Sequence, residues 1–469
     1  MSSPRIIPRD KHSISRGYID PDALRVLYRL HKAGYKAYLV GGSVRDLMTG
    51  RTPKDFDIGT DARPQEVRRL LRNSRIIGRR FRLVHVLFEH GKLVEVSTFR
   101  RRPDKPDIEP SDGTAEVDED ILIRSDNTFG TPEEDAKRRD FTINGLFYDI
   151  ATFSVLDYVG GVEDLEASLV RTIGDPVIRF REDPVRMLRA CEFAARLNFR
   201  MTPDVLAAIE STKAEIRKSA APRVTEELLD PLRRGWGTGT YKIWSEMGIL
   251  DILIPELENE IGPRANASSP SRVVFWKMLA DADARRQKGE FLSDATLLGM
   301  IFIPLVLAAI RLRAGDGKPI DPARILLVLE DVVNPIAARL ALSNLNVHLV
   351  KQALYTLGRL VETRPGDAMA RKLVTKAYFP PAVSLLSLYA EATGRYHDAS
   401  AAWHDVMARA GHRSRAGEDL SHAPFPEALV PHVTHERTPH DFPGPPQRAA
   451  SGRPRRRRRG PQRGASKPA

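Results

Sequence analysis

Residues 38–60, YLVGGSVRDLMTGRTPKDFDIGT, constrain the fold of this 469-residue chain more than any other stretch. The apolar run 38–40 is typical of a buried strand, and it ends at Gly41 and Gly42, which lack a Cβ atom and allow another molecule close to the backbone. Ser43 then stands where a helix N-cap is expected, ahead of a short helical segment. A strand, a glycine turn and a helix start offer free backbone N–H groups and the positive end of a helix dipole. The pattern therefore predicts a phosphate-binding site.

A pair of carboxylates follows this turn. Residues 54–58, KDFDI, have strand character, and their alternation predicts that Asp55 and Asp57 lie on one face. Two carboxylates on one face repel each other unless a cation lies between them, and Mg²⁺ binds carboxylates together with water and phosphate oxygens. Two Mg²⁺ ions, with Mn²⁺ as the alternative, would polarise an attacking hydroxyl and stabilise a leaving pyrophosphate. Taken alone, a glycine pair is more often an ordinary turn, and an Asp-x-Asp pair is more often a solvated strand end.

The combination is more specific than its parts. GGSVRD, followed nine residues later by DFD, resembles the signature of the class II nucleotidyltransferase family, which contains the tRNA CCA-adding enzymes and the bacterial poly(A) polymerases. The resemblance implies that Gly41, Gly42 and Arg45 bind the triphosphate of a nucleotide. It also implies that Asp55 and Asp57 are metal ligands and catalytic residues.

Glu95 is a candidate third metal ligand. It lies in the second of two strongly alternating segments, 81–89 and 92–99, which a tight connection joins into a predicted strand pair. In that strand Glu95 could face the two aspartates. A surface glutamate on an amphipathic strand is an equally good interpretation.

A charge cluster occurs at residues 138–144, RRDFTIN, between apolar segments. By itself it would be interpreted as a solvated helix end. Beside a metal and a triphosphate, however, a guanidinium can bind phosphate oxygens and a carboxylate can join or orient the metal ligands. The run matches the second motif of the class II family letter for letter. The resemblance implies that Arg139 binds the triphosphate and that Asp140 belongs to the catalytic acidic cluster.

The next cluster is the run 181–189, REDPVRMLR. Asp183 is the expected N-cap of a helix with proline in its first turn, and Asp183, Arg186 and Arg189 would then share one helix face. Arginine donates and aspartate accepts, so these groups can complement the edge of a base. The alternative is an intrahelical ion pair worth ~0.3–0.5 kcal/mol. EDPVRMLR resembles the base-selecting motif of the family, which implies contact with the nucleotide base, here adenine.

These patterns predict an α+β protein, with a small head that contains a mixed sheet and helices, then an all-helical part and a disordered basic tail. A proline-rich acidic segment at 101–125 is the predicted loop of the head. The predicted parts are an irregular leader 1–21, a catalytic head 22–173, a helical neck 174–255 that contacts base and RNA, a helical body 256–410, and a tail 411–469.

The net charge of +12 is concentrated in the tail, because residues 445–469 carry nine basic residues and no acidic one. A pI of 9.7 points to an anionic polymer as partner. The run Arg455, Arg456, Arg457, Arg458 and Arg459 is the predicted RNA-binding element of the tail.

Compartment and membrane association also follow from composition. Cys191 is the single cysteine, which excludes an internal disulfide and indicates a cytoplasmic protein. Nothing at the N-terminus resembles a signal peptide. No apolar run reaches 18 residues, and the nearest, 297–310, contains Pro304, so no membrane span is expected.

Two segments, 76–86 and 7–16, resemble those of the bacterial poly(A) polymerases, and a basic tail suits an enzyme that holds generic RNA 3′ ends. The predicted reaction is transfer of AMP from ATP to the 3′-hydroxyl of single-stranded RNA, with release of pyrophosphate and little sequence preference. CCA addition to tRNA with the same residues is the alternative activity. A catalytically silent RNA-binding protein is a third hypothesis, but the intact Asp55, Asp57 and Asp140 argue against it. Protein partners such as RNA-decay factors or helicases cannot be identified from the sequence.

Overall fold

The computed structural model describes residues 3–78, 82–101, 128–314, 321–363, 365 and 368–409. The tail 411–469, with the predicted RNA-binding run 455–459, lies outside the described residues, as does all but the first residue of the predicted loop 101–125. Both therefore stay predictions.

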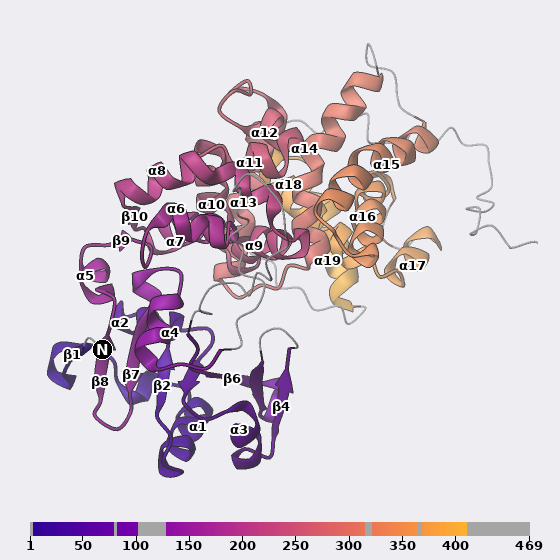
Figure 1. Ribbon diagram of the computed structural model, residues 1–469. Helices are drawn as coiled ribbons and strands as arrows, with labels where there is room; N and C mark the ends of the chain where they lie inside the picture. Colours follow the sequence, from indigo (N-terminus) through magenta and orange to yellow (C-terminus); the bar gives the residue numbers. More distant parts are fainter. Residues whose placement is uncertain are drawn as a thin grey trace, which may run out of the picture. The chain divides into compact units, whose positions relative to one another are not determined.

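The head is built on one mixed sheet, which has eight strands within the described residues, in the order β1-β8-β7-β2-β3-β6-β5-β4. In Figure 1 these strands lie together in the indigo and violet part of the chain. All neighbours are antiparallel except β3 and β6, which are parallel. The strands are β1 (Arg5–Ile7), β2 (Ala37–Val40), β3 (Asp57–Thr60), β4 (Ser74–Ile77), β5 (Leu83–Leu87), β6 (Leu93–Thr98), β7 (Leu146–Asp149) and β8 (Ser154–Asp157).

The register of β3 corrects the predicted position of one aspartate. Val40, the last residue of β2, pairs with Asp57, and the chain then leaves the sheet at the glycine turn. Because β2 offers no backbone beyond Val40, β3 begins at Asp57, and Asp55 lies before the strand rather than on its face. On the other side Asp57 pairs with Glu95 of β6. The strand pair that contains Glu95 is confirmed.

The N-terminal leader is also more ordered than predicted. Residues 1–21 were expected to be irregular, but β1 pairs antiparallel with β8 and forms an edge of the head sheet. Only Ile7 of this strand is buried, which explains why its sequence shows little apolar alternation.

Short helices connect and cover the strands of the head. The second begins at Gly42, and its N-cap is Gly41, so the N-cap predicted at Ser43 is wrong. The Ser43 hydroxyl instead donates a hydrogen bond of 3.0 Å to the carbonyl of Val40, back across the turn. The helices of the head are α1 (Pro21–Lys32), α2 (Gly42–Met48), α3 (Pro64–Leu70), α4 (Pro132–Arg138) and α5 (Gly161–Glu166).

The described residues between 174 and 409 are almost entirely helical, as predicted, apart from a two-residue strand β10 (Arg200–Met201) that pairs with β9 (Leu169–Val170). Figure 1 shows these helices from magenta to yellow. They are α6 (Pro176–Glu182), α7 (Val185–Leu197), α8 (Pro203–Thr212), α9 (Ala221–Arg234), α10 (Gly237–Glu246), α11 (Ile249–Leu253), α12 (Pro255–Ile261), α13 (Pro270–Gln287), α14 (Asp294–Ala314), α15 (Pro322–Arg339), α16 (Asn344–Glu362), α17 (Ala368–Val374), α18 (Phe379–Thr393) and α19 (His397–Arg409). A mixed-sheet head followed by helices confirms the α+β fold.

Helix α14 is the core helix of the helical part. Among the described residues it alone has the length and hydropathy of a membrane span, over Asp294–Arg313, but 78% of that window is buried inside the protein. Neighbouring helices α13, α15, α16 and α18 pack against it. Gly299 permits the closest approach, because a Cβ atom there would lie 2.5 Å from a methyl group of Leu385. Its apolar character is thus explained by packing.

Candidate active site

A cavity of about 250 Å³ brings together most of the residues that the sequence singled out. Its walls come from the glycine turn, the residues before and at the start of β3, the end of α4, and helices α7 and α9. Glu95, Asp183 and Arg186 do not line it. The predicted residues that do are Gly41, Gly42, Arg45, Asp55, Asp57, Arg139, Asp140 and Arg189.

The glycine turn brings two arginines close to the backbone. Gly41 has φ +69°, and a Cβ atom there would lie 2.8 Å from Nη1 of Arg139. A Cβ atom at Gly42 would lie 3.3 Å from Nη2 of Arg45. Glycine is therefore required at position 41 for two reasons. The backbone has a conformation that L-residues rarely adopt, and the Arg139 guanidinium occupies the space that a Cβ atom would need.

Asp57 lies at the start of β3 beside two other carboxylates, Glu95 and Asp55. Burial, together with the nearby carboxylates of Glu95 and Asp55, raises the pKa of Asp57 to about 6, although Arg139 opposes the shift. Across the described ranges, no side chain donates a hydrogen bond to Asp55 or Asp57. Carboxylates that repel one another and have no donor are suited to a cation.

Glu95 acts on this pair from the neighbouring strand. It is paired in register with Asp57, its side chain is 37% exposed, and its Oε2 lies 3.4 Å from Nε2 of His85. Its role as a metal ligand stays a prediction. In the part of the chain that the structure describes, no three His, Cys, Asp or Glu side chains are grouped as a metal site. A bound ion would therefore need ligands from substrate and water.

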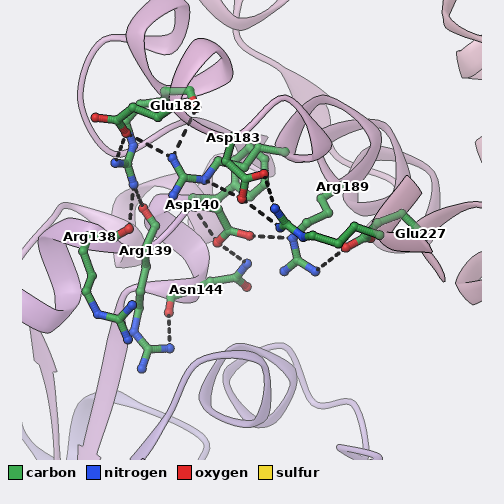
Figure 2. Close-up of polar contacts among 12 residues, drawn as sticks. Arg138, Arg139, Asp140, Asn144, Glu182, Asp183, Arg189 and Glu227 are labelled. Atoms are coloured by element: carbon green, nitrogen blue, oxygen red, sulfur yellow. Dashed lines mark hydrogen bonds and ion pairs between the residues drawn. The ribbon is translucent and has the colours of Figure 1, made fainter. Parts of the chain in front are cut away.

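Asp140 uses both of its oxygens within the protein (Figure 2). Oδ1 accepts hydrogen bonds from the backbone N–H of Phe141 at 2.8 Å and from Nδ2 of Asn144 at 3.0 Å, and Oδ2 accepts one from Nε of Arg189 at 2.9 Å. Burial alone would raise the pKa of Asp140, but Arg189 and the two other donors outweigh it and hold that pKa below its usual value. Asp140 is thus an ionised group that fixes the position of Arg189.

Asn144 joins three of the predicted residues, and sequence reasoning gave it no role. Its Oδ1 accepts a hydrogen bond from Nη1 of Arg45, and its Nδ2 donates to Asp140. Its backbone carbonyl accepts from Nη1 of Arg139 at 3.4 Å (Figure 2). The available signal was chemical, because Asn144 is the single side-chain amide in RRDFTIN and can donate and accept at once.

Buried carboxylates orient the two arginines beside the glycine turn, Arg45 and Arg139. Asp135, 1% exposed, accepts from Nε and Nη2 of Arg139 at 3.2 and 2.9 Å. Asp46 accepts from Nε of Arg45 at 2.9 Å and from Nη2 of Arg196 at 2.7 Å. The guanidinium groups are therefore held in fixed positions before any nucleotide arrives.

Arg179 connects α6 to the RRDFTIN segment. It is 1% exposed, its Nη1 donates to Oε2 of Glu182 at 2.7 Å, and its Nη2 donates to the carbonyls of Arg138, at 2.7 Å, and Arg139. No sequence motif marked this residue, since its partners lie about forty positions away in the chain.

Asp183 differs from its predicted placement, whereas Arg186 lies on the predicted helix, α7. Asp183 is the C-cap of α6 and Pro184 the N-cap of α7, so the predicted N-cap at Asp183 is wrong. The helical conformation is interrupted between α6 and α7. Both oxygens of Asp183 accept hydrogen bonds from Arg223, at 2.9 and 3.0 Å. Arg186 donates to the carbonyl of Arg179 at 3.2 Å and to Glu182 at 3.3 Å. Contact of Asp183 and Arg186 with adenine stays a prediction.

Arg189 is the member of this set that reaches the cavity. Its Nη1 lies 3.6 Å from Glu227, and its guanidinium lies over the ring of Phe193, 5.2 Å from the centroid. Ion pairing with Asp140 and Glu227 raises its pKa further, although burial opposes the shift. Arg189 is a permanent, well-positioned positive charge.

Comparison with known proteins agrees with this arrangement. The profile described as "Poly A polymerase head domain" matches residues 37–171, and "Probable RNA and SrmB- binding site of polymerase A" matches residues 198–261. A poly(A) polymerase I from Escherichia coli O157:H7 is 39% identical over 387 residues, which cover 82% of each chain. The poly(A) polymerase I of Haemophilus influenzae is 31% identical over 390 residues, which cover 83% of this chain and 84% of that one.

CCA-adding enzymes are more distant. That of Levilactobacillus brevis is 40% identical over 204 residues, but these cover only 44% of this chain and 48% of its own length. The crystal structure of the Bacillus stearothermophilus CCA-adding enzyme in complex with CTP has a TM-score of 0.55 and 26% identity, and the match covers 84% of this chain and 82% of that one. It therefore shares the fold of the head and helical part. Similarity over most of its length shows that the chain belongs to the bacterial poly(A) polymerase I family of class II nucleotidyltransferases.

Proposed function

We propose that this poly(A) polymerase transfers AMP from ATP to the 3′-hydroxyl of RNA at the cavity between the glycine turn and helix α7, and releases pyrophosphate. One observation carries the proposal. Asp55 and Asp57, without donors among the described side chains, share a cavity with the glycine turn and three fixed arginines, Arg45, Arg139 and Arg189. Negative groups for metal and positive groups for phosphate thus face the same space.

Asp55 and Asp57 are the proposed metal ligands, with Glu95 as a supporting carboxylate. The fit rests on geometry and donor chemistry: Asp55 and Asp57 line the same cavity, none of the described side chains donates to them, and carboxylate oxygens are ligands that Mg²⁺ prefers. Mg²⁺, with Mn²⁺ as the alternative, completes its coordination with water and phosphate oxygens. When bound, such ions polarise a hydroxyl and neutralise charge that develops on a leaving pyrophosphate.

The triphosphate is assigned to the glycine turn, Arg45 and Arg139. Both guanidiniums are preorganised by buried carboxylates, so little ordering cost remains when phosphate binds. Asp140 is assigned a positioning role, because its oxygens are used by Asn144, Arg189 and the backbone.

Asp183, Arg186 and Arg189 are the proposed adenine-reading residues. In the structure both oxygens of Asp183 accept from Arg223, which is 56% exposed, so adenine would have to replace this bidentate ion pair in order to contact Asp183. Arg186 is meanwhile held in place by Glu182.

RNA is the acceptor and ATP the donor, and we propose that single-stranded 3′ ends are used with little sequence preference. A cytoplasmic location fits the single cysteine, which has no partner for a disulfide within the chain. The test is incubation of the purified chain and Mg²⁺ with a non-tRNA oligonucleotide and each nucleotide in turn. Long extension with ATP alone supports the proposal, whereas addition from CTP to tRNA lacking its end, without oligo(A) extension, favours CCA addition.

A further inference from the structure

A second, strongly basic cavity of about 720 Å³ adjoins the nucleotide cavity. The two share Asp46, Lys54, Arg196 and Arg234, so they meet beside the segment that carries Asp55. Five arginines and one lysine line the second cavity, against one aspartate. Its lining comes from the turn before β3, the ends of α7 and α9, and the end of α13.

Three of these arginines are neutralised by carboxylates. Arg196 binds Asp46 at 2.7 Å, Arg234 binds Asp230 at 2.8 Å, and Arg233 donates twice to Asp294 at 2.8 Å. These ion pairs leave little net charge to attract an anion, and they account for only part of the basic lining.

Arg51 and Arg286 are held differently. Arg51 donates to the carbonyls of residues 196 and 197 at 2.9 and 3.2 Å, and Arg286 donates to the carbonyls of residues 233, at 2.6 Å, and 290. Carbonyl groups orient a guanidinium without cancelling its charge. Lys54 has no hydrogen bond or ion pair in the described ranges of the chain. The cavity therefore presents two oriented guanidinium groups and one ammonium group, and none of the three is paired with a carboxylate among the described residues.

Trp236 supplies an aromatic surface beside these cations. It is half-buried between α9 and α10 and lines the same cavity. Within the residues that the structure describes, its ring makes no stacking or cation–π contact. An indole next to fixed positive charges is the combination by which single-stranded nucleic acids are held, with bases on the ring and phosphates on the cations.

We propose that this cavity binds the RNA strand immediately upstream of its 3′ end, with phosphates on Arg51, Arg286 and Lys54 and a base stacked on Trp236. The proposal rests on the proposed function, since it supplies the acceptor strand to the carboxylates. It extends the RNA-binding surface beyond residues 198–261, because Arg51, Lys54 and Arg286 lie outside that segment.

RNA fits better than a free phosphate compound for two reasons. The cavity has almost three times the volume of the nucleotide cavity, about 720 against 250 Å³. Pyrophosphate would leave Trp236 without a partner, whereas a nucleotide chain uses both the ring and the cations. A strand held here also ends beside Lys54 and Asp55.

The test uses the full chain and a short fluorescent oligo(A), with binding measured by anisotropy without ATP. Arg51→Gln combined with Arg286→Gln keeps an amide donor for the carbonyls and removes two charges. We expect the slope of log K against log salt to flatten by about 1.4, from about 0.7 per phosphate. In steady-state assays the KM for oligo(A) should rise about tenfold, as expected for two charge-assisted contacts, with the KM for ATP and kcat within twofold.

The matched control is Arg264→Gln with Arg324→Gln, two exposed arginines that lie outside both cavities. It should leave the salt slope and both KM values near wild type. Trp236→Ala should weaken oligo(A) binding at least about fivefold, and Trp236→Phe should retain most of it, because stacking is kept. Thermal unfolding checks each variant, and the single Arg286→Gln change replaces the double one if that variant does not fold.

Three results would overturn the proposal: an equal effect of the control pair, a rise in the KM for ATP that parallels that for oligo(A), or weaker inhibition by pyrophosphate with unchanged oligo(A) binding. The last two would assign the cavity to the nucleotide or the leaving group. Failure of the wild type to incorporate AMP would contradict the proposed function instead. The anisotropy measurement without ATP is independent of that outcome.

Discussion

Replacing Asp140 with asparagine should release Arg189, although the side chain keeps its size. The native carboxylate accepts two hydrogen bonds on Oδ1 and one, from Arg189, on Oδ2. Asparagine has a single acceptor oxygen. If that oxygen keeps the two bonds of Oδ1, the amide N–H₂ group faces the Nε–H of Arg189, donor against donor.

The loss of stability is estimated from the hydrogen bond between Asp140 and Arg189 that the substitution removes. A hydrogen bond between charged groups contributes ~1.5–3 kcal/mol, and breaking it also leaves a partly buried guanidinium without its best partner. Arg189 is 35% exposed and keeps Glu227 at 3.6 Å, so the lower end, ~1.5 kcal/mol, is expected.

A double-mutant cycle of Asp140→Asn and Arg189→Met measures this coupling. Urea unfolding followed by tryptophan fluorescence suits the site, because Nε1 of the fully buried Trp244 donates to the carbonyl of Leu188, next to Arg189. The matched control is the pair Asp331→Asn and Arg313→Met, which share one hydrogen bond of 2.7 Å and are 61% and 46% exposed. Its coupling should stay below ~1 kcal/mol.

The reasoning is refuted if the Asp140–Arg189 coupling lies within ~0.5 kcal/mol of zero, the range of additivity for independent sites. It is also refuted if the coupling does not exceed that of the surface pair. Asp140 would then not hold Arg189 in place through this ion pair.

The remaining predictions concern the metal carboxylates, the glycine turn, a buried glutamate and the tail. Asp57→Ala should reduce single-turnover AMP incorporation by far more than tenfold while RNA binding persists, since loss of a metal carboxylate removes several kcal/mol of transition-state stabilisation; incorporation near wild type would contradict the assignment. Gly41→Ala should raise the KM for ATP, because the new Cβ meets Arg139 at 2.8 Å, and an unchanged KM would argue against it. Burial raises the pKa of Glu227 from 4.5 to about 7, so its stabilising effect is complete below pH 4.5 and is lost as the pH rises to 7; melting temperatures of Glu227→Gln should decline less over that interval. Deletion of residues 445–469 should flatten the salt slope of RNA binding by about 3 if half of its basic residues engage, and equal slopes would mean an inert tail.

Much of the fold was predictable because its signals are local. The glycine turn, the strand pair around Glu95 and the long run of amphipathic helices depend on residues a few positions apart, which periodicity detects. The first residue of β3 does not follow from the local sequence, because it depends on where the partner strand β2 ends, at Val40. Register of this kind needs the neighbouring strand, and so Asp55 was placed on a strand that begins only at Asp57.

The site was predictable in its residue types and less so in their connections. Asp140 was expected beside the metal, but its environment depends on Asn144 and on Arg189, which lies 49 positions further along the chain. Asp183 is predicted as the N-cap of α7, but it is the C-cap of α6, and its carboxylate accepts from Arg223. Long-range ion pairs leave no periodic trace in a sequence.

In the RRDFTIN segment, the adjacent charged side chains of Arg139 and Asp140 point in different directions. Arg139 points to the glycine turn, where phosphate is expected, while Asp140 points to Arg189 on α7. Arg179 of α6 donates to the backbone carbonyls of Arg138 and Arg139, at the start of this segment. A shift of α6 would therefore move the backbone that carries Arg139 and Asp140. Under the proposed assignments, with Arg139 on the phosphates and Arg189 on the base, these adjacent residues would link the two contacts, because one backbone turn carries both side chains.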